Sequence, residues 1–260
     1  NILSRRPNPA FGAVTLLNSD QEADYEGLQI TSSLRFNKLF SYNGFYTLSR
    51  TTSSVQLHNN TTQGLAQSFR DLDAEKGAAD TDQRHVFSMS FNFQPDFYNG
   101  SNRFLRGLLN GWSISPIIKA RSGRPFTVTN GGVDANLDGN TNDRARLTGI
   151  SPYLDNPTAA RWFNTAAFAQ NPITTGLAVD GNSPRNYLYG PGFKVVDLAV
   201  SRDFRFGERF RLRLRGEGTN IFNIVNLGQP NSTFSTGTTF GTITDGGAMR
   251  ILQFGARFSF

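Results

Sequence analysis

The sequence ends in LQFGARFSF, residues 252–260, and this stretch alternates between hydrophobic side chains and polar or small ones. The apolar positions are Leu252, Phe254, Ala256, Phe258 and Phe260. The positions between them are Gln253, Gly255, Arg257 and Ser259. Because successive side chains of a β-strand point to opposite faces, this alternation predicts a strand with one apolar face. Chain ends are usually polar and frayed, so an apolar terminal strand needs an explanation.

The same period of two recurs upstream, at 87–93, 196–201 and 209–215. These runs lie within longer stretches of about ten residues or more, the length of a tilted strand that crosses a membrane. The pattern predicts seven strands, near 26–37, 40–52, 84–94, 111–129, 193–204, 208–219 and 249–260. We therefore expect an all-β, antiparallel fold.

The connections between these strands are sorted by length. Those at 37–41 and 204–208 are tight and that at 95–110 is intermediate, whereas those at 53–83, 130–192 and 220–248 are long and rich in Asn, Gly, Thr and Asp. Consecutive antiparallel strands reverse direction, so the long connections all fall at one end. A soluble sandwich has no reason for this sorting, whereas outer-membrane barrels have short periplasmic turns and long extracellular loops. The sequence predicts a transmembrane β-barrel segment in the cell outer membrane, with Phe260 at the periplasmic rim.

Composition excludes several other classes of protein. The 260 residues include 26 Lys and Arg against 20 Asp and Glu, and the arginines lie singly within strands, unlike the clusters that bind nucleic acid. The longest uncharged, apolar-leaning stretch, 108–118, is far shorter than the roughly 20 residues of a membrane-spanning helix. There are two histidines and no cysteine. Although His85 is near Asp80 and Asp82, no nucleophile stands at a recognisable spacing, so we expect no enzyme.

The last eight residues resemble the terminal signal by which the assembly machinery of the outer membrane recognises barrel strands. The matching positions are Gln253, Gly255, Phe258 and Phe260. Physically, the machinery would bind an unpaired strand edge with an apolar outer face. An ordinary amphipathic edge strand that ends the protein is the alternative interpretation.

Longer stretches resemble the C-terminal third of TonB-dependent outer-membrane transporters, closest to the Oar-like group. They are GWSISPIIKARSGRPFTVTNG (111–131), DANLDGNTNDRA (134–145), VVDLAVSRDFRFGERFRLRLRGEGTNIFNIVNLGQPN (195–231) and the terminal strand. NSDQEADYEGLQITSSLRF (18–36) and DLDAEKGAADTDQRHVFSMSF (71–91) extend the resemblance over nearly the whole chain.

The resemblance implies a barrel of about 22 strands around a plug. Seven strands are too few, and an odd number leaves no up-and-down closure, so residues 1–260 are expected to be a C-terminal portion without the plug and the N-terminal domains. Implied partners are outer-membrane lipid and lipopolysaccharide, the barrel assembly machinery, TonB through the missing N-terminal part, and an unknown extracellular ligand. Two alternatives stay open: a small structural or adhesive outer-membrane barrel, and a soluble β-sandwich that binds a ligand.

Charged side chains of the two strands near 193–219 alternate with apolar ones and are expected to face the barrel lumen, because charges on the lipid side are costly. They are Asp197, Asp203, Arg209, Arg211, Arg213 and Arg215. A simple hairpin at 204–208 would place Asp203 opposite Arg209 and Asp197 opposite Arg215, which predicts cross-strand ion pairs. The wall would then be neutralised within itself or against a plug, and a path for an anionic substrate is the alternative. Arg202 falls on the apolar side, where we expect it to extend to the periplasmic interface.

One long connection contains a pattern of oxygen donors typical of a calcium loop. Donors at positions one, three and five precede a glycine at six, and the residues are Asp134, Asn136, Asp138, Gly139, Asn140 and Asp143. Ala145 occupies position twelve, where an EF-hand has a bidentate glutamate, and Asp143 could replace it. We expect that the protein requires no cofactor, and we predict a weak Ca²⁺ site at 134–143. The alternative is a polar turn in which Asn and Gly supply left-handed backbone angles.

Overall fold

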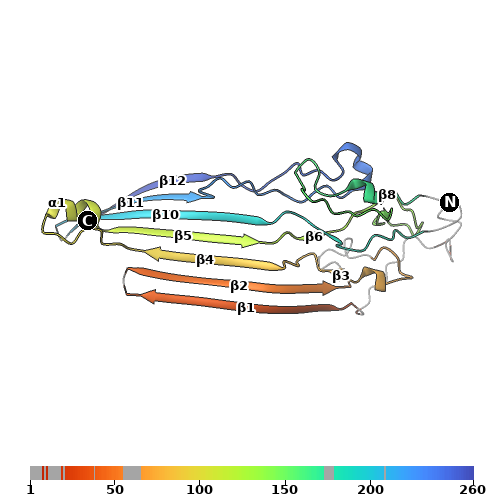
Figure 1. Ribbon diagram of the computed structural model, residues 1–260, viewed down its shortest axis with the longest axis horizontal. Coiled ribbons are helices and arrows are strands. Elements are labelled where there is room, and N and C mark those ends of the chain that lie inside the picture. The colour runs from red at the N-terminus through yellow and green to blue at the C-terminus, as the bar shows by residue number, and fades with distance from the viewer. Residues whose placement is uncertain are drawn as a thin grey trace.

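Seven long strands of the described chain form one antiparallel sheet, in which each strand pairs with the next long strand along the sequence (Figure 1). The computed structural model describes residues 21–37, 39–54, 66–172, 179–207 and 209–260, together with Asn8, Ala10 and Ser19. The long strands are β1 (Ala23–Phe36), β2 (Phe40–Ser53), β4 (His85–Phe93), β5 (Trp112–Arg121), β10 (Phe193–Phe206), β11 (Phe210–Thr219) and β12 (Ile251–Ser259). A two-residue strand, β3 (Gly77–Ala78), also pairs with β2.

The long strands lie close to their predicted ranges, with one marked difference in length. The strand predicted at 111–129 ends at Arg121. Just beyond it, a Cβ atom on Gly123 would lie 1.8 Å from the carbonyl oxygen of Gly190, so only glycine permits this close approach of the two backbones. The chain then forms a separate strand, β6 (Pro125–Phe126), which pairs with β9 (Leu188–Tyr189). The predicted strand therefore combined a strand of the sheet with the start of a loop.

The two ends of the sheet differ (Figure 1). The tight turns after β1 and β10, the connection 94–111 and the C-terminus lie at one end, and the described parts of 54–84, 122–192 and 220–250 extend from the other. The connection 94–111 includes a short helix, α1 (Arg103–Leu109), whose N-cap Asn102 accepts hydrogen bonds from the backbone of Phe104 and Leu105. None of the described helices has the length and apolar character needed to cross a membrane.

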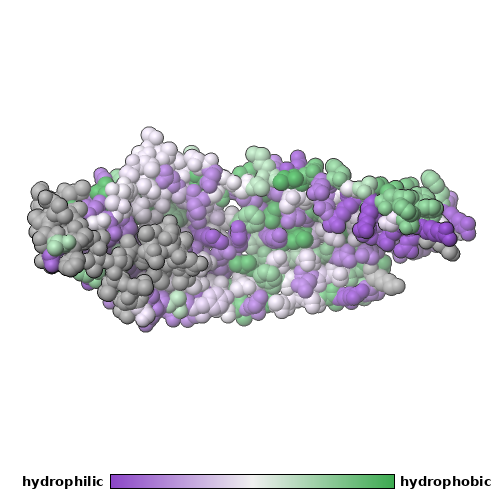
Figure 2. Space-filling view, turned by 180° about the vertical axis from the view of Figure 1, so that it is seen from behind, coloured by the Kyte–Doolittle hydropathy of each residue, from purple (hydrophilic) through white to green (hydrophobic). Residues whose placement is uncertain are grey.

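The pairing register brings the apolar residues of the long strands to one face of the sheet. Leu34 lies opposite Tyr42, and Tyr42 lies opposite Phe91. Near the other edge of the sheet, Leu212 of β11 lies opposite Phe258 of β12. We call this the apolar face: it carries the even-numbered residues of each long strand except β4, which contributes its odd-numbered ones. The opposite side is the polar face. In the view of Figure 2, hydrophobic residues lie among hydrophilic ones over the strands, and the coloured residues at the end with the long connections are mostly hydrophilic or neutral.

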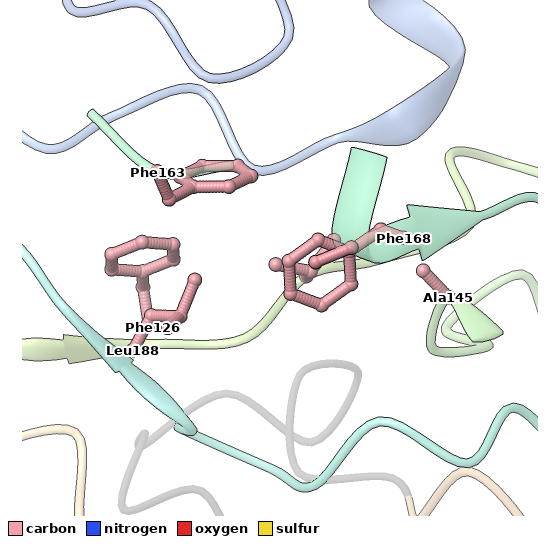
Figure 3. Packing of buried hydrophobic residues seen from close by; sticks show 7 residues of the cluster. Phe126, Ala145, Phe163, Phe168 and Leu188 are labelled. Carbon is pink, nitrogen blue, oxygen red and sulfur yellow. The ribbon is translucent and has the colours of Figure 1, made fainter. Parts of the chain in front are cut away.

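The buried hydrophobic cluster lies in the long connections and not in the sheet (Figure 3). Its members are Phe126, Val128, Ala145, Phe163, Ala167, Phe168 and Leu188. Phe234 and Phe240, from the connection before β12, pack against it. Hydrophobic side chains of the sheet remain largely accessible, as expected of a membrane-facing surface. The long connections thus have a core of their own.

Short elements surround this core. They are η2 (Asp73–Glu75), β6, β7 (Arg146–Leu147), η3 (Thr165–Ala167), β8 (Phe168–Ala169), β9 and η4 (Phe234–Thr239). We call the assembly of residues 66–84, 122–172, 179–192 and 220–250 the loop lobe. Figure 1 shows it as one body at the end of the sheet opposite the C-terminus.

Candidate functional site

The acidic and basic residues of β10 and β11 pair across the polar face. Asp203 was predicted opposite Arg209, which is wrong: Gly207 adopts a φ of 66° in a turn that includes Arg209, and Asp203 lies opposite Arg213. The Nε of Arg213 is 2.7 Å from a carboxylate oxygen of Asp203, and Arg211 pairs with the same carboxylate. The register of the hairpin therefore differs from the predicted one, but Asp203 still forms ion pairs with arginines of β11.

The second predicted pair, Asp197 with Arg215, is also wrong because of this shift. Arg215 lies opposite Ser201 and forms an ion pair with Glu217 on its own strand. Asp197 instead lies 3.7 Å from the Nζ of Lys119 on β5. Each carboxylate on this part of the polar face thus has a basic partner, but Arg211 and Arg213 share Asp203, so the wall neutralises itself only in part.

Arg202 lies on the apolar face near the short-turn end, but its side chain does not extend outward as predicted. It is only 4% exposed. Its guanidinium carbon lies 4.2 Å from the ring centroid of Phe204 and 5.1 Å from that of Trp112. Stacking on two aromatic rings thus shields this cation in an apolar environment.

The terminal strand β12 is an edge of the described sheet, since it pairs only with β11 there. Phe258 stacks on Phe210, with ring centroids 5.9 Å apart, and Phe260 is 94% exposed. Gly255 would have no neighbouring atom within 4 Å of an added Cβ, and Gln253 lies beside it on the polar face. The structure thus presents the residues of the predicted assembly signal at an accessible strand edge.

The polar residues of 134–143 fold into a closely hydrogen-bonded loop of the lobe. The two carboxylate oxygens of Asp134 accept from the backbone N–H groups of Asp138 and Gly139, both at 3.0 Å. Asn136 Oδ1 also accepts from Asp138 N, at 3.1 Å, and Asp138 Oδ1 accepts from Asn140 N, at 2.8 Å. In the part of the chain that is described, no three His, Cys, Asp or Glu side chains gather closely enough to hold a metal. Carboxylates alone therefore do not make a site here.

Asp143 is the interior residue of this loop, with an exposed fraction of 1%. Its Oδ2 accepts from the backbone N–H groups of Ala135, at 2.6 Å, and Asn136, at 3.3 Å. Burial raises the pKa of Asp143 from 3.8 to about 6. The two backbone hydrogen bonds oppose this rise, and the negative charges of Asp138 and Asp134 add to it. The surroundings of Asp143 therefore disfavour the ionised form of its carboxylate.

A buried ionic network joins the first and second long connections, and sequence reasoning missed it. Arg144 Nη1 lies 2.7 Å from Glu75 Oε1, and both side chains are at most 8% exposed. Arg185 donates to the backbone oxygen of Glu75 at 2.6 Å and to Ser53, and lies 3.9 Å from Asp80. Burial lowers the pKa of Arg185, while Asp80 and Glu75 oppose this change. The partners are far apart in sequence, so no local pattern signals them.

His85 and the two aspartates near it in sequence do not converge. The His85 Nδ1 lies 2.8 Å from the hydroxyl of Tyr46, on which its ring stacks. Asp82 accepts from the backbone N–H of Thr51 at 2.7 Å. Asp80 belongs to the ionic network of the lobe. Sequence proximity therefore does not translate into a shared site.

Comparison with known proteins gives one result that bears on these features. A family model described as "Outer membrane beta barrel domain" matches residues 1–253. No match was found among curated proteins. The family match places the chain in the outer membrane, and the apolar face is the surface suited to contact with lipid.

Proposed function

The chain belongs to the outer membrane β-barrel domain family, and we propose that it forms the C-terminal part of the wall of a TonB-dependent transporter of the Oar-like group. In this proposal the protein is an active-transport receptor. The loop lobe contributes to the capture of an extracellular ligand, and an energised partner acts on a plug outside this chain. The resemblance of 111–131, 134–145 and 195–231 to that group supports the proposal.

The observation that carries it is the direction of the two edge strands. β1 and β12 both run toward the short-turn end of the sheet (Figure 1). Bacterial single-chain barrels consist of antiparallel neighbours and have an even number of strands. If β12 closed directly onto β1, the two would form a parallel pair. A closed antiparallel barrel thus requires an odd number of strands in addition to the seven long strands of the described sheet, and a wall of about 22 strands would provide them.

The loop lobe supports a receptor function because it is already ordered by its own core and ionic network. A binding surface that is ordered in advance loses less conformational entropy when a ligand binds. Phe69 and Tyr153 are 72% and 61% exposed on this lobe. Rigid aromatic rings of this kind supply contact area at a low cost in side-chain entropy.

A small structural or adhesive outer-membrane barrel is the second candidate, and the polar face favours it in one respect. Asp203 and Asp197 have basic partners within the sheet, so these two carboxylates need no plug to neutralise them. Such a barrel would still need an odd number of additional strands to restore antiparallel closure.

The full open reading frame that encodes this chain distinguishes the two candidates. For the transporter, we expect a signal peptide, a regulatory-like domain, a plug and about fifteen further alternating strands upstream of Asn1. Loss of energy-dependent uptake in a strain without TonB would then connect the receptor to its energy source. If only a signal peptide and one or a few strands precede Asn1, the transporter proposal is refuted.

A further inference from the structure

We propose that residues 134–143 form a weak Ca²⁺ site that fastens the loop lobe together. The site uses carboxylate and amide oxygens of Asp134, Asn136, Asp138, Asn140 and Asp143. This inference does not depend on transport, because it concerns the lobe in either kind of barrel.

The decisive feature is the second oxygen of Asp143. The side chain is 1% exposed, and its Oδ2 is held by the backbone N–H groups of Ala135 and Asn136 inside the loop. Its Oδ1 is buried and has no hydrogen-bond partner among the described residues. A buried carboxylate oxygen without a partner is costly. A cation inside the loop would supply the missing partner.

A second acceptor has its orientation set from outside the loop. The Nδ2 of Asn136 donates to the backbone oxygen of Gln67 at 2.7 Å and to Asp180 Oδ1 at 2.9 Å. Because two acceptors occupy the amide nitrogen, Asn136 Oδ1 points to the loop side, where it lies 3.1 Å from Asp138 N. Asp134 Oδ1 lies 3.0 Å from the same nitrogen. Two oxygen donors are therefore brought together before any cation binds.

The backbone follows the course that such donors require. Gly139, at position six of the loop, has a φ of 98°, the sharp turn for which calcium loops use glycine. Leu137 has a φ of 57°, a conformation that is unfavourable for leucine and is maintained here by the surrounding hydrogen bonds. Asp138 lies between these two residues, and its side chain is exposed.

The donor chemistry selects calcium. All five side chains offer oxygen, which Ca²⁺ prefers, whereas zinc favours nitrogen and sulfur. Mg²⁺ demands a tight octahedral shell and loses its water reluctantly. Ala145 replaces the bidentate glutamate of an EF-hand, and Asp138 must move inward to bind. The affinity therefore belongs to the weak class of extracellular sites, with a Kd of about 0.1–1 mM.

The position of the loop explains what the cation would do. Asn142 donates to the backbone oxygen of Ala66 at 3.0 Å, and Asn136 donates to that of Gln67. Arg144, directly after the loop, pairs with Glu75. The loop thus contacts residues of the first long connection at two points, and the residue after the loop adds a third contact. A cation that rigidifies 134–143 stabilises the contact between the two connections.

The test uses the full-length protein that contains this chain, purified in detergent micelles, with Ca²⁺ binding measured by isothermal titration calorimetry and lobe order by limited proteolysis. We expect a Kd of about 0.1–1 mM for Ca²⁺ and a clearly weaker response to Mg²⁺. Asp143→Asn keeps the shape of the side chain but removes its charge, and we expect it to weaken Ca²⁺ binding at least about tenfold. Asp155→Asn is the matched control, because Asp155 is exposed in the same connection.

The proposal is overturned if the wild-type chain binds no Ca²⁺ up to about 10 mM, if Mg²⁺ binds equally well, or if Asp143→Asn binds Ca²⁺ like the wild type. Proteolysis in a chelator shows whether Asp143→Asn still folds. If it does not fold, Asp134→Asn decides in its place: weakened Ca²⁺ binding supports the proposal, and unchanged binding contradicts it.

Discussion

Phe163 packs against three other aromatic rings in the core of the loop lobe. It is 2% exposed, and its ring centroid lies 5.7 Å from Phe126, 5.6 Å from Phe168 and 5.2 Å from Phe240. Replacing a buried phenylalanine with alanine costs about 3–5 kcal/mol through lost transfer energy and the remaining cavity. Phe163 takes no part in the ladder of the long strands. We therefore expect Phe163→Ala to unfold the lobe while the wall persists.

Two measurements on the protein in outer-membrane preparations separate these effects. Limited proteolysis at increasing urea reports the lobe, and the heat-dependent shift of the folded barrel on a gel reports the wall. Phe69→Ala is the control, since it makes the same chemical change at a side chain that is 72% exposed. The reasoning fails if Phe163→Ala resists protease as well as the control does, or if the wall is lost together with the lobe.

Three further predictions concern single features. Glu75→Gln leaves the buried Arg144 without an anionic partner, and urea-dependent proteolysis should show that the lobe loses about 3–5 kcal/mol. In a chelator, the lobe should become less stable as the pH rises from about 4 to 7, because the pKa of Asp143 is about 6 in the folded protein and 3.8 for an ordinary aspartate. This difference in pKa corresponds to roughly 3 kcal/mol of stability. In urea titrations at several pH values, Asp143→Asn should abolish this dependence on pH. Phe260→Ala should reduce the fraction of chain assembled in the outer membrane, as measured by the gel shift, whereas Phe260→Trp should preserve it.

The strands could be predicted because a lipid-facing surface imposes a strict period of two. Leu212 and Leu214 must be apolar, and the residues between them are free to be charged, so the pattern is visible in a single sequence. The register of their hairpin could not be predicted, since it depends on the conformation of the turn. With Gly207 in a left-handed conformation in the turn, Asp203 lies opposite Arg213, whereas the prediction placed it opposite Arg209.

The candidate site was predicted only where its residues are close in sequence. The donors of 134–143 could be proposed from the sequence because a calcium loop is a local motif, and calcium binding there stays a prediction. The pairing of Glu75 with Arg144 and the packing of Phe163 on Phe240 join residues that are far apart in the chain. Aromatic residues in long irregular connections have no period, so the sequence contains no signal for their partners.

The separation between the wall and the core of the lobe determines what can vary in this chain. A substitution on the apolar face exchanges contacts with lipid, and one in the ladder disturbs two neighbouring strands at once. The contacts of Phe163 and Arg144, in contrast, are made within the lobe. Exposed residues such as Tyr153 can therefore change the outer surface of the lobe without altering the assembly of the wall. In a receptor, this arrangement lets ligand specificity diverge on a constant barrel, and a cation at 134–143 would determine how rigidly the new surface is held.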